Sequence, residues 1–244
     1  MDVIYGIHPV EEAIASRPRA IEYIAVARNR RDAKTERIVE RSRQTGIALR
    51  FLSREEIRRL TRTDSHQGVA AVAAARSYLG LEELVGQRRG HHAFLLVLDG
   101  VEDPHNLGAI IRTADGAGAD GVILPERRSV GVNATVAKAA AGAAETLPIA
   151  RVTNIVRTLE ELKRQNIWTV GLDERGTQAY DELDYQMDCA LVLGGEGSGL
   201  HELVRKHCDF LVSIPMLGKV PSLNVSVAAA VVMYELARQR RHQA

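Results

Sequence analysis

The chain contains few cysteines and no long hydrophobic run, and both features exclude certain classes of protein. Its two cysteines, Cys189 and Cys208, form neither a CxxC pair nor a zinc-ligand set, and no cluster of histidine, cysteine and carboxylate residues offers a metal site. No uncharged apolar stretch reaches about 18 residues, so we expect no membrane-spanning helix. The N-terminal MDVIYGIHPVEEA lacks the basic and apolar regions of a secretory signal. We therefore expect a metal-free protein of the reducing cytoplasm that does not contact a membrane.

The net charge of the chain is only +1, but the charges are unevenly distributed. Residues 1–76 contain 15 Lys and Arg against 10 Asp and Glu, a net charge of +5. Residues 77–244 contain 17 against 21, a net charge of −4. A basic front part attached to an acidic back part suggests that the front part meets a polyanion. On composition alone, a solvated arginine-rich surface explains the asymmetry equally well.

Alternating apolar and amphipathic stretches predict a small α/β unit over residues 1–76. Gly46 ends the first predicted helix, as a glycine after the last helical turn commonly does. Ser53 caps the second helix, which carries two glutamates in its first turn. The predicted strands are residues 20–26, 47–52 and 67–75, and the predicted helices are residues 32–44 and 53–60.

A glycine-containing linker, residues 77–92, leads to a second predicted unit, residues 93–244. The linker contains one possible helical turn, LEELV. The second unit opens with the continuous apolar run FLLVL, which is typical of a strand buried on both faces of a parallel sheet. Strands then alternate with helices, which predicts an α/β fold with a parallel sheet. The predicted strands are residues 94–98, 121–124, 167–171, 189–193 and 210–214, and the predicted helices are residues 107–118, 133–144, 154–165, 201–206 and 224–241.

The first segment with polar chemistry is LDGVEDPHNLGAIIRTADGAGA, residues 98–119. It starts at the end of a predicted strand, and open α/β sheets bind ligands where such a strand passes into the next helix. We expect Asn106 just before the helix and Arg112 in its second turn, about 9 Å further along the axis. Arg112 could then grip a phosphate. On this segment alone, a surface pairing with Asp115 or Glu102 explains it better.

The second segment is LVLGGEGSGL, residues 191–200, in which an apolar strand runs into a glycine-rich turn. Glycines allow a backbone to approach a ligand closely. The turn only loosely resembles a dinucleotide-binding loop, because it does not lie in a first βαβ unit and no acidic residue ends the next strand. Glu196 would also repel a pyrophosphate, whereas a cationic ligand would tolerate it.

The third segment is SIPMLGKVPSLNVSVAAAVVMYE, residues 213–235. Pro215 ends a strand, and Ser222 or Asn224 caps a long helix with an uncharged face rich in alanine and valine. Such a face packs against another helix or a partner subunit. Helix capping alone accounts for both polar residues.

Taken together and in this order, the three segments resemble the motifs of the SpoU family of RNA ribose 2′-O-methyltransferases. The matching patterns are N-x5-R after a strand, LGGEGSGL, and IPMxGxVxSLNVSVAAA, and they span about residues 94–241. The front unit, with YGIHPVEEA near its start and SHQGVAA at residues 65–71, resembles the substrate-binding domain of the subgroup that methylates a guanosine of 23S ribosomal RNA. This second match is shorter, and relatives that act on tRNA stay open as an alternative.

The resemblance implies a parallel-sheet catalytic domain with a deep trefoil knot of the SPOUT type, preceded by a small α/β RNA-binding domain. It also implies S-adenosyl-L-methionine as cofactor, an obligate homodimer and 23S ribosomal RNA as partner. The positions that match the family's functional polar residues are Asn106, Arg112, Glu196, Ser222 and Asn224. The positions expected to contact the cofactor, largely through backbone groups, are Gly194, Gly195, Gly197, Ile214, Met216 and Leu223.

The chemistry of the implied reaction suggests roles for these residues. A ribose 2′-hydroxyl is a poor nucleophile until it loses its proton, so the enzyme must align the reactants and stabilise the developing alkoxide. The family's motif arginine, here Arg112, is often described as the base, but guanidinium holds its proton to a pKa above about 12. We therefore expect Arg112 to grip the target's phosphate, and Asn106 to orient the ribose or Arg112. Glu196 and Asn224 would fix the loops, and Ser222 would help to place the nucleotide.

Two functions of other classes stay open at this point. A dinucleotide-dependent oxidoreductase is disfavoured by the composition of the glycine-rich turn. A non-catalytic RNA-binding protein that has kept the fold is disfavoured by the intact motif residues.

Overall fold

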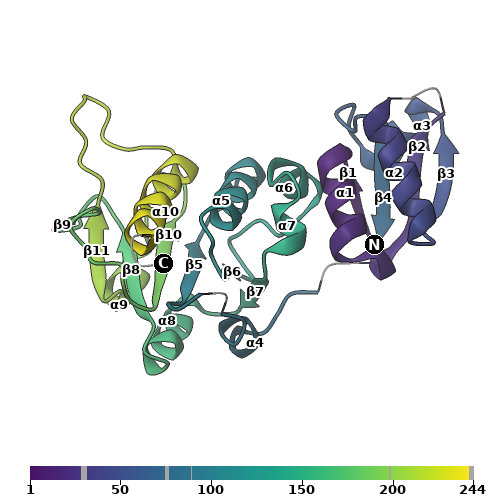
Figure 1. Ribbon diagram of the computed structural model, residues 1–244. Coiled ribbons are helices and arrows are strands. Elements are labelled where there is room, and N and C mark those ends of the chain that lie inside the picture. The colour runs from purple at the N-terminus through teal and green to yellow at the C-terminus, as the bar shows by residue number, and fades with distance from the viewer. Residues whose placement is uncertain (29–31, 75–76, 89, 198, 242–244) are drawn as a thin grey trace. The chain divides into compact units, whose positions relative to one another are not determined.

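The computed structural model describes residues 1–28, 32–74, 77–88, 90–197 and 199–241 (Figure 1). The chain forms two compact units, each with its own sheet. Unit 1 contains Met1–Ser77 and Val132–Thr146, and unit 2 contains Tyr78–Gly131 and Leu147–Ala244. Residues 75 and 76, at the predicted end of the front unit and of its last strand, lie outside the described residues.

Unit 1 has a four-stranded sheet in the order β1-β4-β2-β3. Strand β4 is antiparallel to β1 and β2, whereas β2 and β3 are parallel. The predicted capping by Ser53, here at the start of α3, is confirmed, because Ser53 and Glu56 form a reciprocal capping box. The strands are β1 (Asp2–Tyr5), β2 (Ile21–Ala27), β3 (Ala48–Leu52) and β4 (Val69–Ala73), and the helices of residues 1–77 are α1 (Ile7–Ser16), the 3-10 helix η1 (Pro18–Ala20), α2 (Ala33–Gln44) and α3 (Arg54–Thr61).

The prediction of a single helix over residues 133–144 of the back unit is wrong. The segment forms two short helices, α6 (Ala134–Ala139) and α7 (Ala143–Thr146), separated by residues with positive φ, Ala141 and Gly142. Both helices belong to unit 1. The carboxylate of Glu145, 2% exposed, accepts a hydrogen bond from the Nε of Arg17, and Lys138 donates to the carbonyl of Ser65. The segment between two strands of unit 2 thus completes the core of unit 1.

Unit 2 has a seven-stranded sheet in the order β7-β6-β5-β10-β8-β11-β9, and all of its strand pairs are parallel. The predicted parallel α/β fold is confirmed. Two strands had no sequence signal because they are very short, namely β7 and β9. The strands are β5 (Phe94–Asp99), β6 (Gly121–Pro125), β7 (Ile149–Val152), β8 (Trp168–Leu172), β9 (Gln178–Ala179), β10 (Cys189–Gly194) and β11 (Phe210–Ser213).

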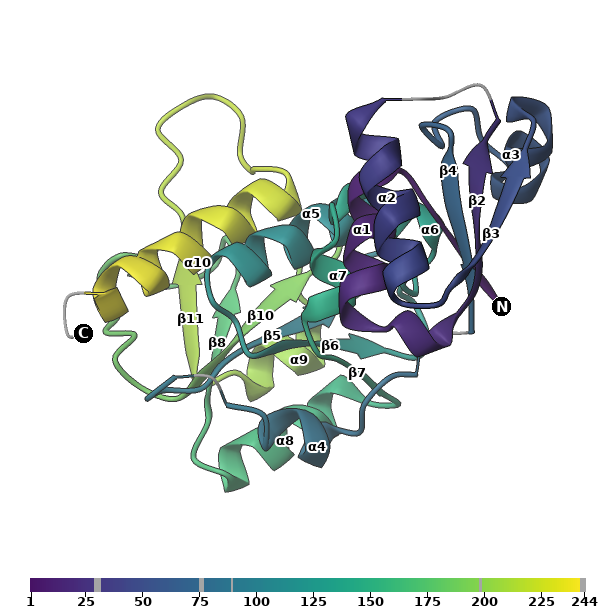
Figure 2. The ribbon, with the colours of Figure 1, turned by 45° about the vertical axis from the view of Figure 1, so that its right-hand side comes forward.

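Helices cover both faces of this sheet (Figure 2). One face packs on α4 (Leu81–Val85), α8 (Ile155–Arg164) and α9 (Glu202–His207), whose buried side chains share one apolar cluster with the sheet. On the other face, α5 (Pro104–Gly116) and α10 (Val225–Arg241) lie side by side. Among the described residues, no helix combines the length and the apolarity that a membrane crossing requires.

Strand β5, the first strand of unit 2 along the chain, lies in the middle of the sheet between β6 and β10. The strand order therefore reverses at β5. In open α/β sheets, ligands bind at such a point, beyond the carboxyl ends of the strands. Asp99 and Gly194, the last residues of β5 and β10, are partners in register, so the segments that follow these two strands start side by side.

Candidate functional site

A cavity of about 320 Å³ lies at the carboxyl ends of β8, β10 and β11 in unit 2. Its walls come from the loops that follow these three strands and from the start of α10. The cavity brings together nine of the eleven residues predicted for the site: Gly194, Gly195, Glu196, Gly197, Ile214, Met216, Ser222, Leu223 and Asn224.

The glycine-rich turn is folded tightly on itself and against the end of β5. Gly195 and Gly199 form an antiparallel bridge across the turn. A Cβ at Gly194 would overlap the backbone of Gly199 and Leu200, and a Cβ at Gly195 would overlap the carbonyl of Gly100. Gly194 and Gly195 are therefore required because other backbone segments of the same chain pack closely against them. The sequence suggested instead that these glycines allow the backbone to approach a ligand. Ser198, in the same motif, lies outside the described residues.

Three polar residues from the three motifs are joined by hydrogen bonds at the cavity. The side-chain amide of Asn106 donates to Glu196 Oε1 over 2.8 Å, and the amide of Asn224 donates to Asn106 Oδ1 over 3.1 Å. The backbone N–H of Glu102 donates to the second oxygen of Glu196 over 3.3 Å. Asn106 is thus held on both sides, with its amide orientation set by the carboxylate of Glu196.

Local structure explains how these side chains are presented. Asn224 Oδ1 accepts hydrogen bonds from the backbone N–H and the hydroxyl of Ser226, so Asn224 also organises the start of α10. The expectation that Asn106 precedes its helix is wrong. Helix α5 begins at Pro104, with Asp103 accepting from the backbone N–H of His105 over 2.7 Å. Proline suits this first position because its missing N–H would have no helical partner.

Arg112 lies on α5, is exposed, and does not line the cavity. It has no hydrogen-bond or ion-pair partner among the described residues, so the suggested pairing with Asp115 or Glu102 does not form. Its guanidinium is available to a ligand outside the single chain.

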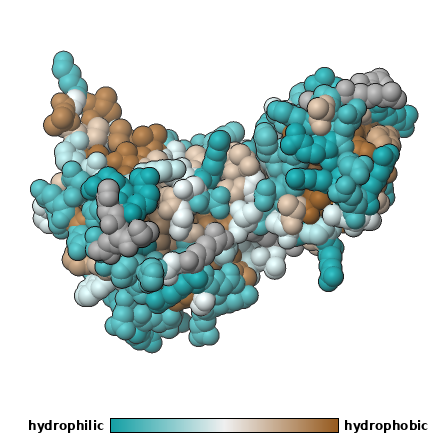
Figure 3. Space-filling view, in the orientation of Figure 1, coloured by the Kyte–Doolittle hydropathy of each residue, from teal (hydrophilic) through white to brown (hydrophobic). Residues whose placement is uncertain are grey.

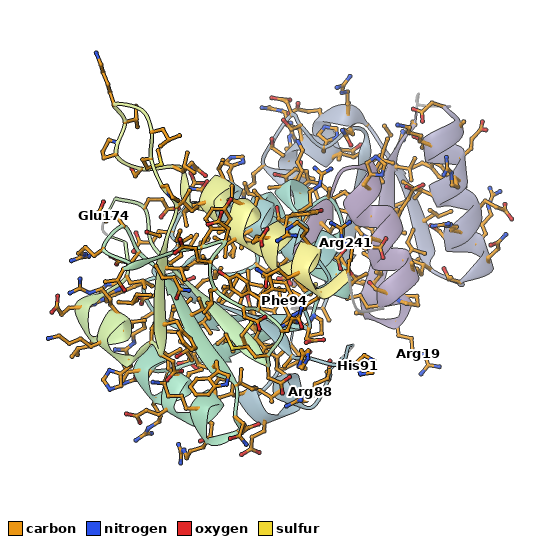
Figure 4. All side chains as sticks on the ribbon, turned by 60° about the vertical axis from the view of Figure 1, so that its left-hand side comes forward. Arg19, Arg88, His91, Phe94, Glu174 and Arg241 are labelled. Atoms are coloured by element: carbon orange, nitrogen blue, oxygen red, sulfur yellow. The ribbon has the colours of Figure 1, made fainter. Side chains whose placement is uncertain are left out.

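The end of β8 and the loop after it contribute cavity residues that the sequence motifs did not indicate, namely Leu172, Asp173, Glu174 and Arg175. The side chain of Asp173 is 1% exposed and accepts from both the backbone N–H and the Nε of Arg175. This contact raises the pKa of Arg175 above its ordinary value. Figure 4 labels Glu174 on this loop. The sequence could have indicated these residues only by their position, because they follow the carboxyl end of a predicted strand, where open α/β sheets bind ligands.

The cavity combines apolar walls with an excess of negative charge. Its carboxylates are Asp173, Glu174 and Glu196, against one arginine, Arg175, that is already paired. Apolar side chains from Leu172, Leu193, Ile214 and Leu223 complete the wall. The site therefore suits a ligand with a flat apolar part and a positive charge.

These features define unit 2 as a parallel α/β ligand-binding domain with a glycine-rich turn and a polar network at the strand ends. The chain belongs to the SpoU rRNA Methylase family, which matches residues 93–234. Residues 3–79 match the family described as RNA 2′-O ribose methyltransferase substrate binding. The resemblance drawn from the sequence motifs is confirmed.

Relatives cover nearly the whole chain. The chain is 46% identical over 239 residues to the 23S rRNA (guanosine-2′-O-)-methyltransferase RlmB of Ralstonia nicotianae, covering 98% of this chain and 96% of the relative. It is 43% identical over 241 residues to the putative TrmH family tRNA/rRNA methyltransferase YacO of Bacillus subtilis, covering 98% and 96%.

Solved structures agree with the fold. The SpoU methyltransferase AviRb from Streptomyces viridochromogenes, in complex with AdoMet, superposes with a TM-score of 0.83 at 25% identity, covering 98% of this chain and 90% of AviRb. The AdoMet-bound rRNA methyltransferase from Sinorhizobium meliloti superposes with a TM-score of 0.80 at 26% identity, covering 100% and 88%.

Proposed function

We propose that this protein transfers a methyl group from S-adenosyl-L-methionine to the ribose 2′-hydroxyl of a guanosine in 23S ribosomal RNA. The observation that carries the proposal is the hydrogen-bonded chain Glu196–Asn106–Asn224 at the edge of an acidic, partly apolar cavity. Relatives named for this activity match along 98% of the chain at up to 46% identity.

The residues of the cavity fit the cofactor. Leu172, Ile214 and Leu223 offer apolar surface to an adenine, and the carboxylates of Glu174 and Glu196 suit a sulfonium and an ammonium group. Backbone groups of Gly194, Gly195, Gly197 and Met216 complete the proposed cofactor-binding set. When bound, S-adenosyl-L-methionine supplies a methyl group on a good leaving group, so the proposal includes no metal.

The protein's own residues then position the acceptor. Asn106, fixed by Glu196 and Asn224, is oriented to hydrogen-bond the target ribose, and Ser222 lies at the cavity wall where the nucleotide enters. Arg112, free of partners among the described residues of its own chain, grips the target's phosphate and stabilises the developing alkoxide. Preorganised groups of this kind lower the barrier by alignment rather than by strong acid–base chemistry.

The proposal includes a homodimer and the trefoil knot expected from the family. Several apolar residues of the β11–α10 loop and α10 are exposed, among them Leu217, fully exposed, and Tyr234, 51% exposed. In Figure 3, hydrophobic surface gathers over this loop. A second copy of the chain would cover it.

We propose that residues 1–76 bind the RNA, that residues 77–92 link the two parts, and that residues 93–244 catalyse methyl transfer in the cytoplasm. The net charge of +5 on the front part and its match to a substrate-binding family support this assignment.

A tRNA substrate is the second candidate. The tRNA modifying enzyme TrmH/SpoU of A. aeolicus is 30% identical, but it covers only 67% of this chain, with a TM-score of 0.58. The relatives named for 23S rRNA match over both units, which favours rRNA. Incubating the protein with labelled S-adenosyl-L-methionine and either 23S rRNA or total tRNA, followed by mapping of 2′-O-methyl positions, tests the proposal. Label in tRNA alone would exclude the rRNA assignment, and no label in either would leave an RNA-binding protein.

A further inference from the structure

A second group of residues lies at the same edge of unit 2 but outside the cavity. It is formed by Asp99 at the end of β5, His201 after the glycine-rich turn, and Arg127 and Arg128 after β6. The group therefore gathers at the reversal of strand order, where ligands of open α/β sheets bind. The proposed transfer assigns no role to any of these residues.

Asp99 holds His201 through both of its oxygens. The Oδ2 atom accepts from the backbone N–H of His201 over 2.8 Å, and the Oδ1 atom lies 3.0 Å from the ring Nδ1. The carboxylate is 8% exposed, whereas the imidazole is 46% exposed. Since Nδ1 is engaged, the group that remains for a ligand is Nε2, on a ring whose orientation is fixed.

The loop after β6 meets the same imidazole at Gly100. A Cβ at Gly100 would lie 3.3 Å from His201 Cε1 and 3.9 Å from the carbonyl oxygen of Arg128. Arg128 has a positive φ of 58°, which is uncommon for a residue other than glycine. The backbone N–H of Val130 donates to the carbonyl of Val101, which ties the loop to the segment after β5. The backbone of Arg128 is thus held next to the ring.

The loop after β6 carries positive charge that the chain does not neutralise. Arg127 and Arg128 are exposed and have no ion-pair partner within the described part of the chain. Three carboxylates of the neighbouring segments are already engaged: Asp99 by His201, Glu196 by Asn106 and Glu102, and Glu202 by Arg205 and Lys206. Glu102, three residues after Asp99, and Glu126, on the loop itself, add two exposed negative charges.

We propose that His201, Arg127 and Arg128 form a subsite for a phosphodiester of the RNA strand that carries the target nucleotide. This inference rests on the proposed function and adds to it the part of the substrate held beside the reacting ribose. Arginine and protonated histidine both donate charge-assisted hydrogen bonds to phosphate oxygens. Asp99 holds both the backbone and the ring of His201, which directly follows the glycine-rich turn. A phosphate bound by His201 would therefore lie at a fixed position with respect to that turn and to the methyl donor.

Steady-state methyl transfer to a 23S rRNA fragment tests the subsite in the full-length protein. His201→Gln, Arg127→Gln and Arg128→Gly should each raise the KM for RNA about 5- to 20-fold, with kcat at saturating RNA and cofactor affinity little changed. Glycine is chosen at position 128 because it accepts the positive φ. The matched control is His207→Gln, at the other end of α9. An unchanged KM in all three variants would overturn the proposal.

A second measurement separates charge from shape. Fluorescence anisotropy with the same RNA fragment at one fixed pH should show that His201→Gln binds more weakly than the wild type. His201→Arg, which keeps a cation at this position, should retain most of the wild-type affinity. Wild-type affinity in His201→Gln would contradict the subsite. Absence of methyl transfer by the wild type to any RNA would instead refute the proposed function, which keeps the two failures distinct.

Discussion

The side-chain amide of Asn224 donates to the side-chain oxygen Oδ1 of Asn106 over 3.1 Å, joining residues 118 positions apart. The bond connects the starts of α5 and α10, and Glu196 extends it to the glycine-rich turn. Three segments with weak individual signals therefore form one polar unit. Its members are expected to act together rather than as independent contributors.

The first prediction concerns this coupling. Asn106→Ala and Asn224→Ala should each lower kcat for methyl transfer about 10- to 100-fold, and the double variant should lose less than the product of the two factors. The reason is that either change already removes the hydrogen bond between the two side chains. A double-mutant cycle on kcat measures the coupling. Strictly multiplicative losses would show that the two residues act independently.

The second prediction distinguishes the glycines of the turn. Gly194→Ala should prevent stable folding, because its Cβ would overlap the backbone of Gly199 and Leu200. Gly197 has a positive φ of 81° but open space around its Cβ position, so Gly197→Ala should cost about 1–2 kcal/mol and still fold.

Gly218 provides the matched control for the glycine series. It has open space around its Cβ position and no positive φ, so Gly218→Ala should leave stability within about 0.5 kcal/mol of the wild type. Thermal unfolding of all three variants provides the readout for stability, and S-adenosyl-L-methionine calorimetry is restricted to Gly197→Ala and Gly218→Ala, which are expected to fold. A fully stable Gly194→Ala protein would contradict the packing described for the turn.

Much of unit 2 could be predicted from the sequence because its strands are continuous apolar runs. FLLVL and CALVL have no alternation to misplace, and both form buried central strands. The strands β7 and β9 could not be found, since β7 (IARV) has an arginine within its four residues and β9 has only two residues. The break at Ala141 and Gly142 was missed because a run of alanines favours a continuous helix, whereas tertiary packing decided the local conformation.

The candidate site shows a similar division. Gly194, Glu196 and Asn224 could be singled out by residue type and motif, and the structure places them at one cavity. Asp173 and Arg175 could not, because an Asp–Arg pair two residues apart in a loop looks like ordinary surface charge. Only Asp173 of the pair is buried, and it lies next to the glycine-rich turn, since a Cβ at Gly199 would be 3.8 Å from its Oδ2. Packing between segments that are distant in sequence cannot be predicted from the local residue pattern.

The third prediction concerns the two thiols. Burial raises the pKa of Cys189 and of Cys208 to about 12, so neither should react with iodoacetamide at about pH 8 in the folded protein. Both should react after denaturation. Since the unfolded thiols lose their protons near pH 9 and the folded ones near pH 12, the stability from these groups is complete below about pH 9 and decreases as pH rises from 9 to 12. Mass spectrometry of alkylated protein checks the reactivity, and rapid native labelling would contradict the burial.

The fourth prediction concerns self-association. The protein should be a dimer at micromolar concentration, because exposed Val227 and Tyr234 on α10 and Leu217 on the preceding loop form surface suited to a second copy. Val227→Glu should weaken the dimer at least about 10-fold without unfolding the chain, since the side chain is 49% exposed. Light scattering over a dilution series measures the effect. Arg164→Glu, on the opposite face of the sheet, is the control, and a monomeric wild type would refute the assignment.

The last prediction tests whether the basic front part delivers the RNA. Deleting residues 1–76 would be a poor test, because it removes Arg17 and the helix α1 that cover Glu145 and α7. Neutralising exposed arginines in the intact chain avoids this problem.

The variant Arg41→Gln, Arg43→Gln, Arg50→Gln and Arg54→Gln should fold normally, because all four side chains are exposed. Each phosphate that the variant no longer binds keeps its counterion, so the slope of log affinity against log salt should become shallower by up to about one for every such phosphate. Affinity for S-adenosyl-L-methionine should not change, since the cavity lies wholly in unit 2. The control replaces Arg157 and Arg164 on α8. A salt titration of RNA binding decides the question: if the front variant and the control keep the wild-type affinity and slope, the front part does not bind the RNA.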